Sequence, residues 1–580
     1  MAVRRSFPTG GVLRRSPIRL RPVDVLVGAG TLALLYAIVR LGRSMNSSFL
    51  PDRASKSVST APSKLPYYAA RSLLRMFVAL GLSVVFTFVY ATAAARLRRA
   101  ERVLIPLLDI LQSVPILGFL SITVTAFVAL FPGSTLGLEC AAIFAIFTSQ
   151  AWNMTFSFYH SLITQPRDLD EAARLYRLTK WQRFWRLDVP SSMIGLVWNG
   201  MMSFGGGWFF LAAAESISVL NKRYALPGIG SYVAAAVEQG SLAKVGIAIV
   251  VMVVMVVAVN VGFWRPLVAW AERFRLEDSE AAERPRSVVL DALRRSSLPA
   301  VLGRVSRPVG RILDRVTRPF GLAEHPLVPD AGRERVGDVA FMVALTGVVG
   351  WGALSGLRYI GGTVGFEEFP HAFGLGAITF ARVLVLLVFS TVVWVPVGVT
   401  IGMNPRLARY AQPVVQIMAS FPAILLFPFA TVAFVRLGIG LNVGGILLMA
   451  LGAQWYILFN AIAGGMSIPN DLREMATNLG LDRRRRWERL ILPAIFPAYV
   501  TGGITAAGGA WNASIVAEIV DFGHHHLVAT GLGAYIADAT TVGAFPRILT
   551  GVIVMSVYVV GLNRLVWRRL YRLAETRFSL

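Results

Sequence analysis

Long apolar stretches recur through the sequence and restrict its fold more than any other feature. About twelve of them are long enough to cross a bilayer, which takes roughly 20 helical residues. They lie at 23–42, 68–93, 104–131, 137–163, 191–214, 242–268, 339–358, 378–401, 412–435, 443–465, 494–517 and 545–567. Only 15% of the residues are charged, against roughly 25% in soluble domains. The sequence therefore predicts an all-α polytopic membrane protein.

The distribution of arginine predicts the orientation of these spans. Basic clusters fall on alternate loops, as the positive-inside rule requires of cytoplasmic loops. Both termini are then cytoplasmic, and so is an arginine-rich linker at 271–337. Parts of this linker could lie on anionic membrane lipids, although a simple tether is the favoured interpretation. The net charge of +25 is spread over these clusters, which argues against a nucleic-acid partner.

The chain is one unit repeated. Residues 75–115 align without gaps with 382–422, and after a four-residue shift the alignment continues for more than a hundred residues, pairing Trp208 with Trp511 and Glu215 with Glu518. Six spans in each half give both copies the same orientation, which predicts two parallel six-helix repeats with a pathway between them. The expected segments are a tail at 1–22, halves at 23–270 and 338–568, the linker at 271–337 and a tail at 569–580.

A polar loop lies between the fourth and fifth spans of each half. It reads EAARLYRLTKWQRFWRLDVP at 171–190 and EMATNLGLDRRRRWERLILP at 474–493. Asp168 and Asp471 each precede a glutamate by three positions, the spacing of a capping box with the aspartate as N-cap. A short helix is therefore expected to start at about 169 and 472, with small residues offering a face that another protein can approach. These small residues are Ala172, Ala173 and Ala476.

These loops resemble the cytoplasmic loop of binding-protein-dependent ABC importer permeases, most closely those of the nitrate, sulfonate, taurine and bicarbonate type. LQSVP (111–115), ASFP (419–422), AWNASIVAE (510–518) and GLGAYI (531–536) support the same resemblance. It implies a bacterial inner-membrane importer whose short loop helices dock on two separate ATP-binding subunits, and which works with a periplasmic or lipid-anchored solute-binding protein. The solute implied is a small anion. The docking residues implied are Asp168, Glu171, Ala172, Ala173, Arg177, Asp471, Glu474, Ala476 and Gly480.

The first loop departs from the family pattern at its helix end. Gly480 fits a left-handed residue after the second helix, and Arg177 occupies the matching place in the first. A left-handed arginine costs roughly 1–2 kcal/mol, so the first helix is expected to run on or to end in a different turn. The two docking sites are then unequal.

Other sequence features argue against catalysis, nucleotide binding and metal binding by this chain. No phosphate-binding G-x-x-x-x-G-K-[ST] motif occurs, the single Cys140 excludes a cysteine-based metal cluster, and no catalytic set converges by spacing. Adjacent histidines at 524–526 diverge too much to hold one metal easily. Neither a catalytic residue, a metal site nor a cofactor is therefore expected.

Several polar and aromatic residues are candidates for contact with the solute, with ordinary helix packing as the alternative. They are Trp152, Asn153, Trp208, Trp511 and Asn512. Glu215 and Glu518 are placed at the outer boundary, where anchoring of the outer loop is expected, and Arg75 and Arg382 are expected to snorkel to the membrane surface. A secondary transporter with fused repeats is the alternative function, and a membrane enzyme or scaffold is a further one.

Overall fold

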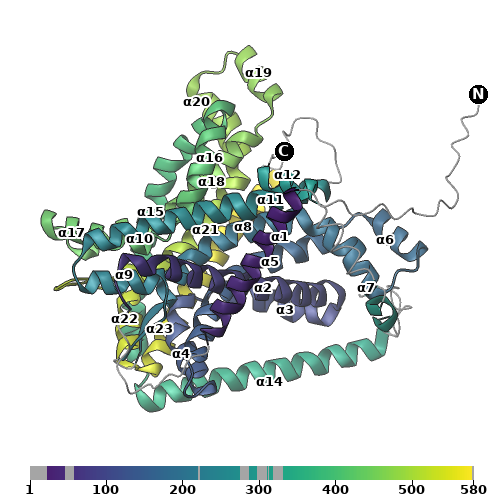
Figure 1. Cartoon of the computed structure of the whole chain (residues 1–580). Coiled ribbons are helices and arrows are strands. Elements are labelled where there is room, and N and C mark those ends of the chain that lie inside the picture. Colours follow the sequence, from purple (N-terminus) through teal and green to yellow (C-terminus); the bar gives the residue numbers. More distant parts are fainter. Residues whose placement is uncertain are drawn as a thin grey trace, which may run out of the picture.

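The computed structural model describes residues 22–45, 58–219, 222–274, 287–296, 308, 310, 312–317 and 331–577. The expected N-terminal tail and most of the expected linker lie outside these residues. The described chain is almost entirely helical, with two short antiparallel hairpins, so the all-α prediction is confirmed (Figure 1).

The first half contains the elements α1 (Pro22–Arg43), α2 (Leu65–Arg96), α3 (Arg98–Ser113), α4 (Ile116–Leu130), α5 (Leu136–Ile163), α6 (Arg167–Leu175), α7 (Lys180–Arg183), α8 (Val189–Ala214), β1 (Ser216–Val219), β2 (Lys222–Ala225), α9 (Ile229–Glu238), α10 (Leu242–Val259) and α11 (Arg265–Ala271). The linker contributes α12 (Val288–Arg295).

The second half repeats this order. It contains α14 (Ala331–Thr363), α15 (Glu368–Gly402), α16 (Pro405–Ser420), α17 (Phe427–Leu437), α18 (Leu441–Ser467), α19 (Asn470–Asn478), α20 (Arg483–Arg486), α21 (Leu492–Ala517), β3 (Ile519–Phe522), β4 (His525–Val528), α22 (Leu532–Val542), α23 (Phe545–Leu562) and α24 (Arg568–Arg577). Each half also has two π-helical turns, at Phe184–Asp188 and Asn260–Trp264 and at the equivalent Trp487–Ile491 and Asn563–Trp567.

Two of the expected spans are not single helices. Within 104–131, α3 and α4 meet at 102°, and within 412–435, α16 and α17 meet at 82°. Prolines explain both breaks, because the residue before a proline is pushed out of the helical region. Val114 before Pro115 and Phe421 before Pro422 are both extended, with ψ of 124° and 130°. The described residues hold seven helices able to span a membrane, or up to nine if each bent pair counts as one.

The bent pairs connect the two halves reciprocally. The α4 helix packs on α21 and α23 of the second half, whereas α16 packs on α8 and α10 of the first. Buried residues of α4, such as Leu117 and Leu120, belong to the core of the second half, and Leu425, between α16 and α17, belongs to the core of the first. Each apolar core therefore contains a segment supplied by the other half.

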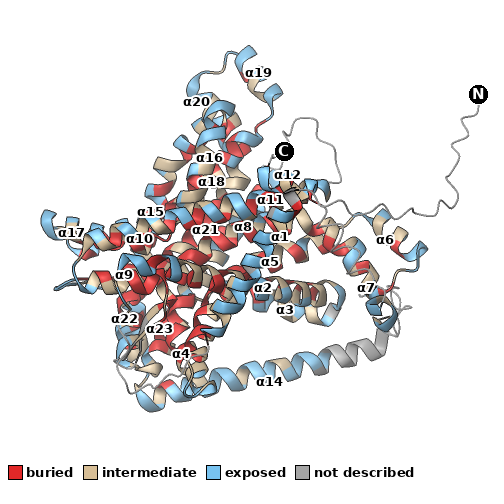
Figure 2. Cartoon of the chain, in the orientation of Figure 1, coloured by how far each residue is buried: buried red, intermediate tan, exposed pale blue. Residues whose placement is uncertain are grey.

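Within each half, three long helices pack in sequence and form the red interior of Figure 2. They are α2, α5 and α8 in the first half and α15, α18 and α21 in the second. In contrast, the most apolar 18-residue stretch of α14 has no buried residue. Pale blue covers most of the described part of this helix in Figure 2. An apolar helix with so little packing fits exposure to lipid acyl chains.

Candidate functional site

The two loop helices, α6 and α19, project from the helical body at separate corners (Figure 1). Each follows a long helix, α5 or α18, and each begins directly after a proline: Pro166 or Pro469. Asp168 and Asp471 lie at the second position of their helices, and neither helix has a side-chain cap. The predicted capping box is therefore wrong. Each helix starts directly after the proline, earlier than expected. The aspartates therefore lie in the first turn, where the helix dipole stabilises a negative charge.

Side-chain caps occur one helix later in each loop. Thr179 and Gln182 form a complete capping box at the start of α7. At the equivalent place Asp482 accepts a bond of 3.0 Å from the backbone N–H of Arg485. The second short helix of each loop thus has the cap that was expected for the first.

Both loop helices end in the same turn. The backbone N–H of Leu178 bonds the carbonyl of Ala173 at 3.1 Å, and that of Leu481 bonds the carbonyl of Ala476 at 3.1 Å, the long bond of a Schellman motif. Arg177 has φ +47° and Gly480 has φ +62°, and Arg177 is the one described non-glycine residue with positive φ. The expectation that Arg177 avoids this conformation is wrong, because the backbone bonds of the turn form in the first loop as they do in the second.

The exposed surface of these helices is not the one expected. Ala173 and Ala476 are 3% and 2% exposed, so they face the rest of the chain and cannot form the approach face, while Ala172 is partly exposed. Glu171 and Glu474 are exposed. Large apolar side chains of the same short segments are also exposed: Tyr176 is 76% exposed, Leu479 67% and Met475 51%. Each loop helix, with the turn that follows it, therefore presents both a carboxylate and exposed apolar side chains.

The attachment of each loop helix differs between the halves. In the first loop, Arg183 pairs with Asp170 of α6 and with Asp188, whose carboxylate also pairs with Arg96 of α2 at 2.8 Å. In the second loop, Arg473 occupies the position equivalent to Asp170. Arg473 donates to the carbonyls of Met403 and Gly465 at 3.1 and 2.7 Å. An ion-pair network thus holds the first helix, and bonds to backbone carbonyls hold the second.

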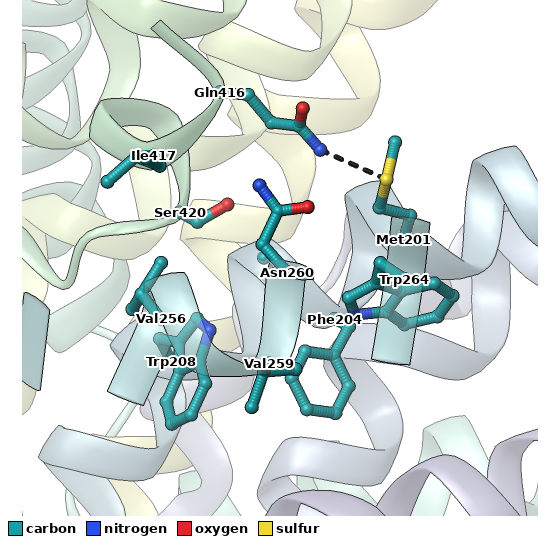
Figure 3. Close-up of a pocket in the computed structure, with 11 residues that line it drawn as sticks. Met201, Phe204, Trp208, Val256, Val259, Asn260, Trp264, Gln416, Ile417 and Ser420 are labelled. Atoms are coloured by element: carbon teal, nitrogen blue, oxygen red, sulfur yellow. Dashed lines mark hydrogen bonds between the residues drawn. The ribbon is translucent and has the colours of Figure 1, made fainter. Parts of the chain in front are cut away.

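A small cavity lies at the interface between the halves (Figure 3). It encloses about 20 Å³, which is space for about one water molecule. Its lining comes from α8, from α10 with the following π-helical turn, and from α16, and includes Met201, Gly205, Trp208, Asn260, Gln416 and Ser420. A Cβ atom on Gly205 would lie 2.6 Å from the hydroxyl oxygen of Ser420, so glycine permits this close approach of the halves.

The predicted aromatic pathway residues are packed inside the protein. Trp208 and Trp511 are each 1% exposed. Trp208 lines the cavity, whereas Trp511 belongs to a cluster of three aromatic rings with Phe380 and Tyr558. Trp152 packs against Phe86, with ring centroids 5.7 Å apart. Their contact with a solute remains a prediction.

The two predicted asparagines make different contacts. The side-chain oxygen of Asn512 accepts a bond of 2.8 Å from the backbone N–H of Ile116, which ties α21 to the start of α4. Asn153 receives a weak bond of 3.5 Å from Gln112. Sequence reasoning missed Gln416, Ser420 and Asn260, although Ser420 lies in the ASFP motif that supported the family resemblance.

Buried ion pairs lie at the opposite end of α8 and α21 from the loop helices. Arg75 is fully buried and bonds Glu139 and Glu215 at 2.6 Å each. In the second half Arg382 bonds Glu518 at 2.8 Å. The expectation that both arginines snorkel is therefore wrong, because each is neutralised inside the protein.

The two glutamates hold the segment that follows each hairpin. Glu215 accepts from the backbone N–H of Gly230 at 2.7 Å, and Glu518 accepts from that of Ala534 at 3.1 Å. A Cβ atom on Gly228 or Gly531 would lie 2.2 or 2.3 Å from these carboxylates. The expected anchoring of the outer loop agrees with these contacts, and the repeated glycines leave room for the carboxylates.

In the hairpin β3–β4, His526 contacts Asp521. No group of three His, Cys, Asp or Glu within the described ranges is arranged to hold a metal ion.

Two segments of the chain, residues 83–264 and 394–579, match the family described as the binding-protein-dependent transport system inner membrane component. The chain belongs to this family. The two matches fall on the two repeats, so the chain contains two fused family domains, as the sequence predicted. The bent helix pair and the loop helix of each half lie inside the matched segments.

Among similar proteins are three transport permeases. The nitrate import permease NrtB of Leptolyngbya laminosa is 26% identical over 190 residues, 33% of this chain and 64% of that protein. The bicarbonate transport permease CmpB of Synechococcus elongatus is 29% identical over 177 residues, 30% and 60% of the two chains. The taurine transport permease TauC of Escherichia coli is 26% identical over 181 residues, 31% and 62%. The chain thus spans less than two thirds of each relative's length.

Proposed function

We propose that this chain is the permease subunit of an ATP-driven importer and forms the pathway for a small anion of the nitrate, sulfonate or bicarbonate type. Its relatives are named for the import of nitrate and for the transport of bicarbonate and taurine. The reciprocal packing of the halves supports a pathway along their interface, and the cavity beside Gln416 marks the place where they meet.

The observation that carries the proposal is the repeated loop helix. Both copies begin after a proline, end in the same left-handed turn and present a glutamate and exposed apolar side chains. Exposed apolar side chains on a geometry that occurs twice suit a protein partner better than water. We assign α6 and α19 as the docking sites of two ATP-binding subunits.

The mechanism follows from where these sites lie. Each loop helix joins α5 to α8 or α18 to α21, and α8 also lines the interface cavity. When ATP draws the two subunits together, the loop helices move with them. Rigid helices transmit this movement to the interface, so the halves open alternately toward one side and the other. ATP hydrolysis occurs on the partners, and this chain needs no cofactor.

The remaining assignments follow from the same proposal. A periplasmic or lipid-anchored solute-binding protein delivers the solute to the end of the molecule that carries the hairpins. The chain resides in a bacterial inner membrane with cytoplasmic termini and with the loop helices on the cytoplasmic side. No nucleic acid takes part.

Co-purification tests the docking sites. Tyr176→Asp and Leu479→Asp place a charge in the exposed apolar patches, and we expect each to weaken co-purification of the ATP-binding subunit by about tenfold or more. Val528→Asp, an equivalent change in the hairpin at the other end of α21, is the matched control and is expected to have no effect.

ATP dependence separates the importer from a secondary transporter. The purified chain alone is expected to release no phosphate from ATP, and the assembled complex in proteoliposomes is expected to accumulate anion only with ATP inside. Uptake driven by an ion gradient without ATP would contradict the proposal.

A further inference from the structure

The cavity between the halves is lined by polar groups without charge. Gln416 and Ser420 come from α16, and Asn260 is the first residue of the π-helical turn after α10. Figure 3 shows the amides of Gln416 and Asn260 pointing into the same space, with Ser420 beside them. The remaining lining is apolar or aromatic. The site therefore offers amide and hydroxyl hydrogens and no carboxylate.

Two of the donors here are poorly satisfied. The side-chain N–H of Gln416 bonds the sulfur of Met201 at 3.0 Å, and a thioether is a weak acceptor. Trp264 also lines the cavity, and its buried indole N–H has no acceptor among the described residues. Buried donors normally have a partner, and each exception calls for an explanation. A hydrogen-bond acceptor that occupies the site only transiently would supply one.

The backbone around Asn260 also marks the site. A π-helical turn adds one residue to a helix, is rare, and is often found at functional sites. This turn, Asn260–Trp264, contributes both ends to the cavity lining. The extra residue therefore brings an amide and an indole into the same space.

The repeat does not reproduce this donor set on its other side. In the alignment of 75–115 with 382–422, the residue that matches Gln416 is Asp109, an exposed residue on α3. Asn563 matches Asn260 and also opens a π-helical turn. A carboxylate repels an anion that an amide can bind, so the first half's α3 is the less suitable side. An anion that passes between the halves is thus expected to meet Gln416.

We propose that Gln416, together with Asn260 and the indole N–H of Trp264, contacts and selects a small oxyanion as it crosses the interface. This inference rests on the proposed function and names the residues that recognise its solute. The cavity holds about one water molecule here, so α16 and α8 must separate at the contact of Gly205 with Ser420 before an anion can enter. The side-chain N–H of Gln416 then donates its hydrogen bond to an oxygen of the anion in place of the sulfur of Met201.

The test uses the full chain in a complex with its ATP-binding subunits and solute-binding protein, reconstituted in proteoliposomes. Nitrate, bicarbonate and taurine are offered separately, and KM and maximal rate of uptake are measured. Gln416→Leu removes the donor at similar size, and Gln416→Glu replaces it with an anion. Gln454→Leu is the matched control, because Gln454 is another buried glutamine of the second half and accepts its bond from Trp394.

We expect Gln416→Leu to raise the KM of the transported anion by about tenfold or more, as loss of a hydrogen bond to a charged group would. We expect Gln416→Glu to reduce uptake further, and Gln454→Leu to leave KM unchanged. ATP hydrolysis without solute is measured in the same complexes, which separates recognition from loss of folding or coupling.

Three results would overturn the inference. One is a parental KM in Gln416→Leu, and another is parental uptake in Gln416→Glu. An equal rise of KM in Gln454→Leu would assign the effect to general packing. If the parental complex itself takes up none of the three solutes, the proposed transport fails, and the inference fails with it.

Discussion

Arg177 shows how strongly its surroundings determine a backbone conformation that its own side chain disfavours. Its φ of +47° lies in the left-handed region, which glycine enters at little cost. The repeat supplies an internal comparison, because Gly480 adopts the same conformation in the other loop. The loop of the first half therefore has a small amount of backbone strain that the loop of the second half lacks.

Substitutions at these two positions should shift the local stability of the loops in opposite directions. We expect Arg177→Gly to stabilise α6 against local opening by about 1 kcal/mol, because the left-handed strain is removed. Gly480→Ala should destabilise α19 by about the same amount through strain alone, since a Cβ there would meet no atom within 4 Å. Amide hydrogen exchange over 167–178 and 470–481 measures both effects. Faster exchange of α6 in Arg177→Gly would contradict the explanation.

At the scale of elements, the two loop helices share a shape but differ in their attachment. The first is held by charges that are largely buried, since Arg183 and Asp188 are 8% and 3% exposed, and the second by bonds to neutral acceptors. Both sets of bonds come from charged guanidinium groups, but only the first set joins them to carboxylates, and the Asp188 side chain is buried. Taking the partner from a buried charge costs more than losing a bond to a neutral acceptor, so we expect the first loop helix to be held more firmly than the second.

Removing one arginine from each loop tests this difference. Arg183→Met takes the partner from Asp170 and leaves Asp188 with Arg96 and a longer bond of 3.3 Å from Gln165, so we expect α6 to open more easily by about 1.5–3 kcal/mol. The matched change, Arg486→Met, removes bonds to the carbonyl of Arg473 and the hydroxyl of Thr477. These acceptors are neutral and no carboxylate loses its partner, so the cost in α19 should be smaller, about 0.5–1.5 kcal/mol. Hydrogen exchange of the two helices gives the comparison, and equal effects would show that the carboxylates add nothing.

The sequence predicted what depends on local pattern. Apolar runs, prolines and the spacing of the repeat located the long helices, the loop helices and the two halves. It did not predict features that depend on residues far apart in the chain. The partners of Arg75, Glu139 and Glu215, are 64 and 140 positions away, and no local pattern indicates that they meet. The conformation of Arg177 was missed because propensity was weighed without the contacts that override it.

At the scale of the whole molecule, the reciprocal exchange of bent helix pairs makes the two halves one structure. Buried side chains of α4 complete the core of the second half, and Leu425 enters that of the first. Packing of this kind, together with the bond between Asn512 and Ile116, should hold the halves together without a covalent link.

A chain divided between Ala300 and Val301, in a segment outside the described residues, tests this expectation. Co-expressed fragments should co-purify in detergent because their cores interpenetrate. Gly205→Leu, which places atoms where Ser420 lies, should reduce their association by about 1–3 kcal/mol, as overpacking typically does. Fragments that separate completely in the parental sequence would show that the linker, and not the packing, joins the halves.

The fusion of two halves also changes what natural selection can act on. In a pair of identical chains, one mutation alters both symmetry-related positions, so a residue useful on one side is imposed on the other. Here the equivalent helices α3 and α16 are encoded by different codons. Glutamine at 416 and aspartate at 109 occupy equivalent places in the repeat, as do Asn442 and Glu139. A mutation can therefore change one interface of this chain without changing the equivalent position in the other half.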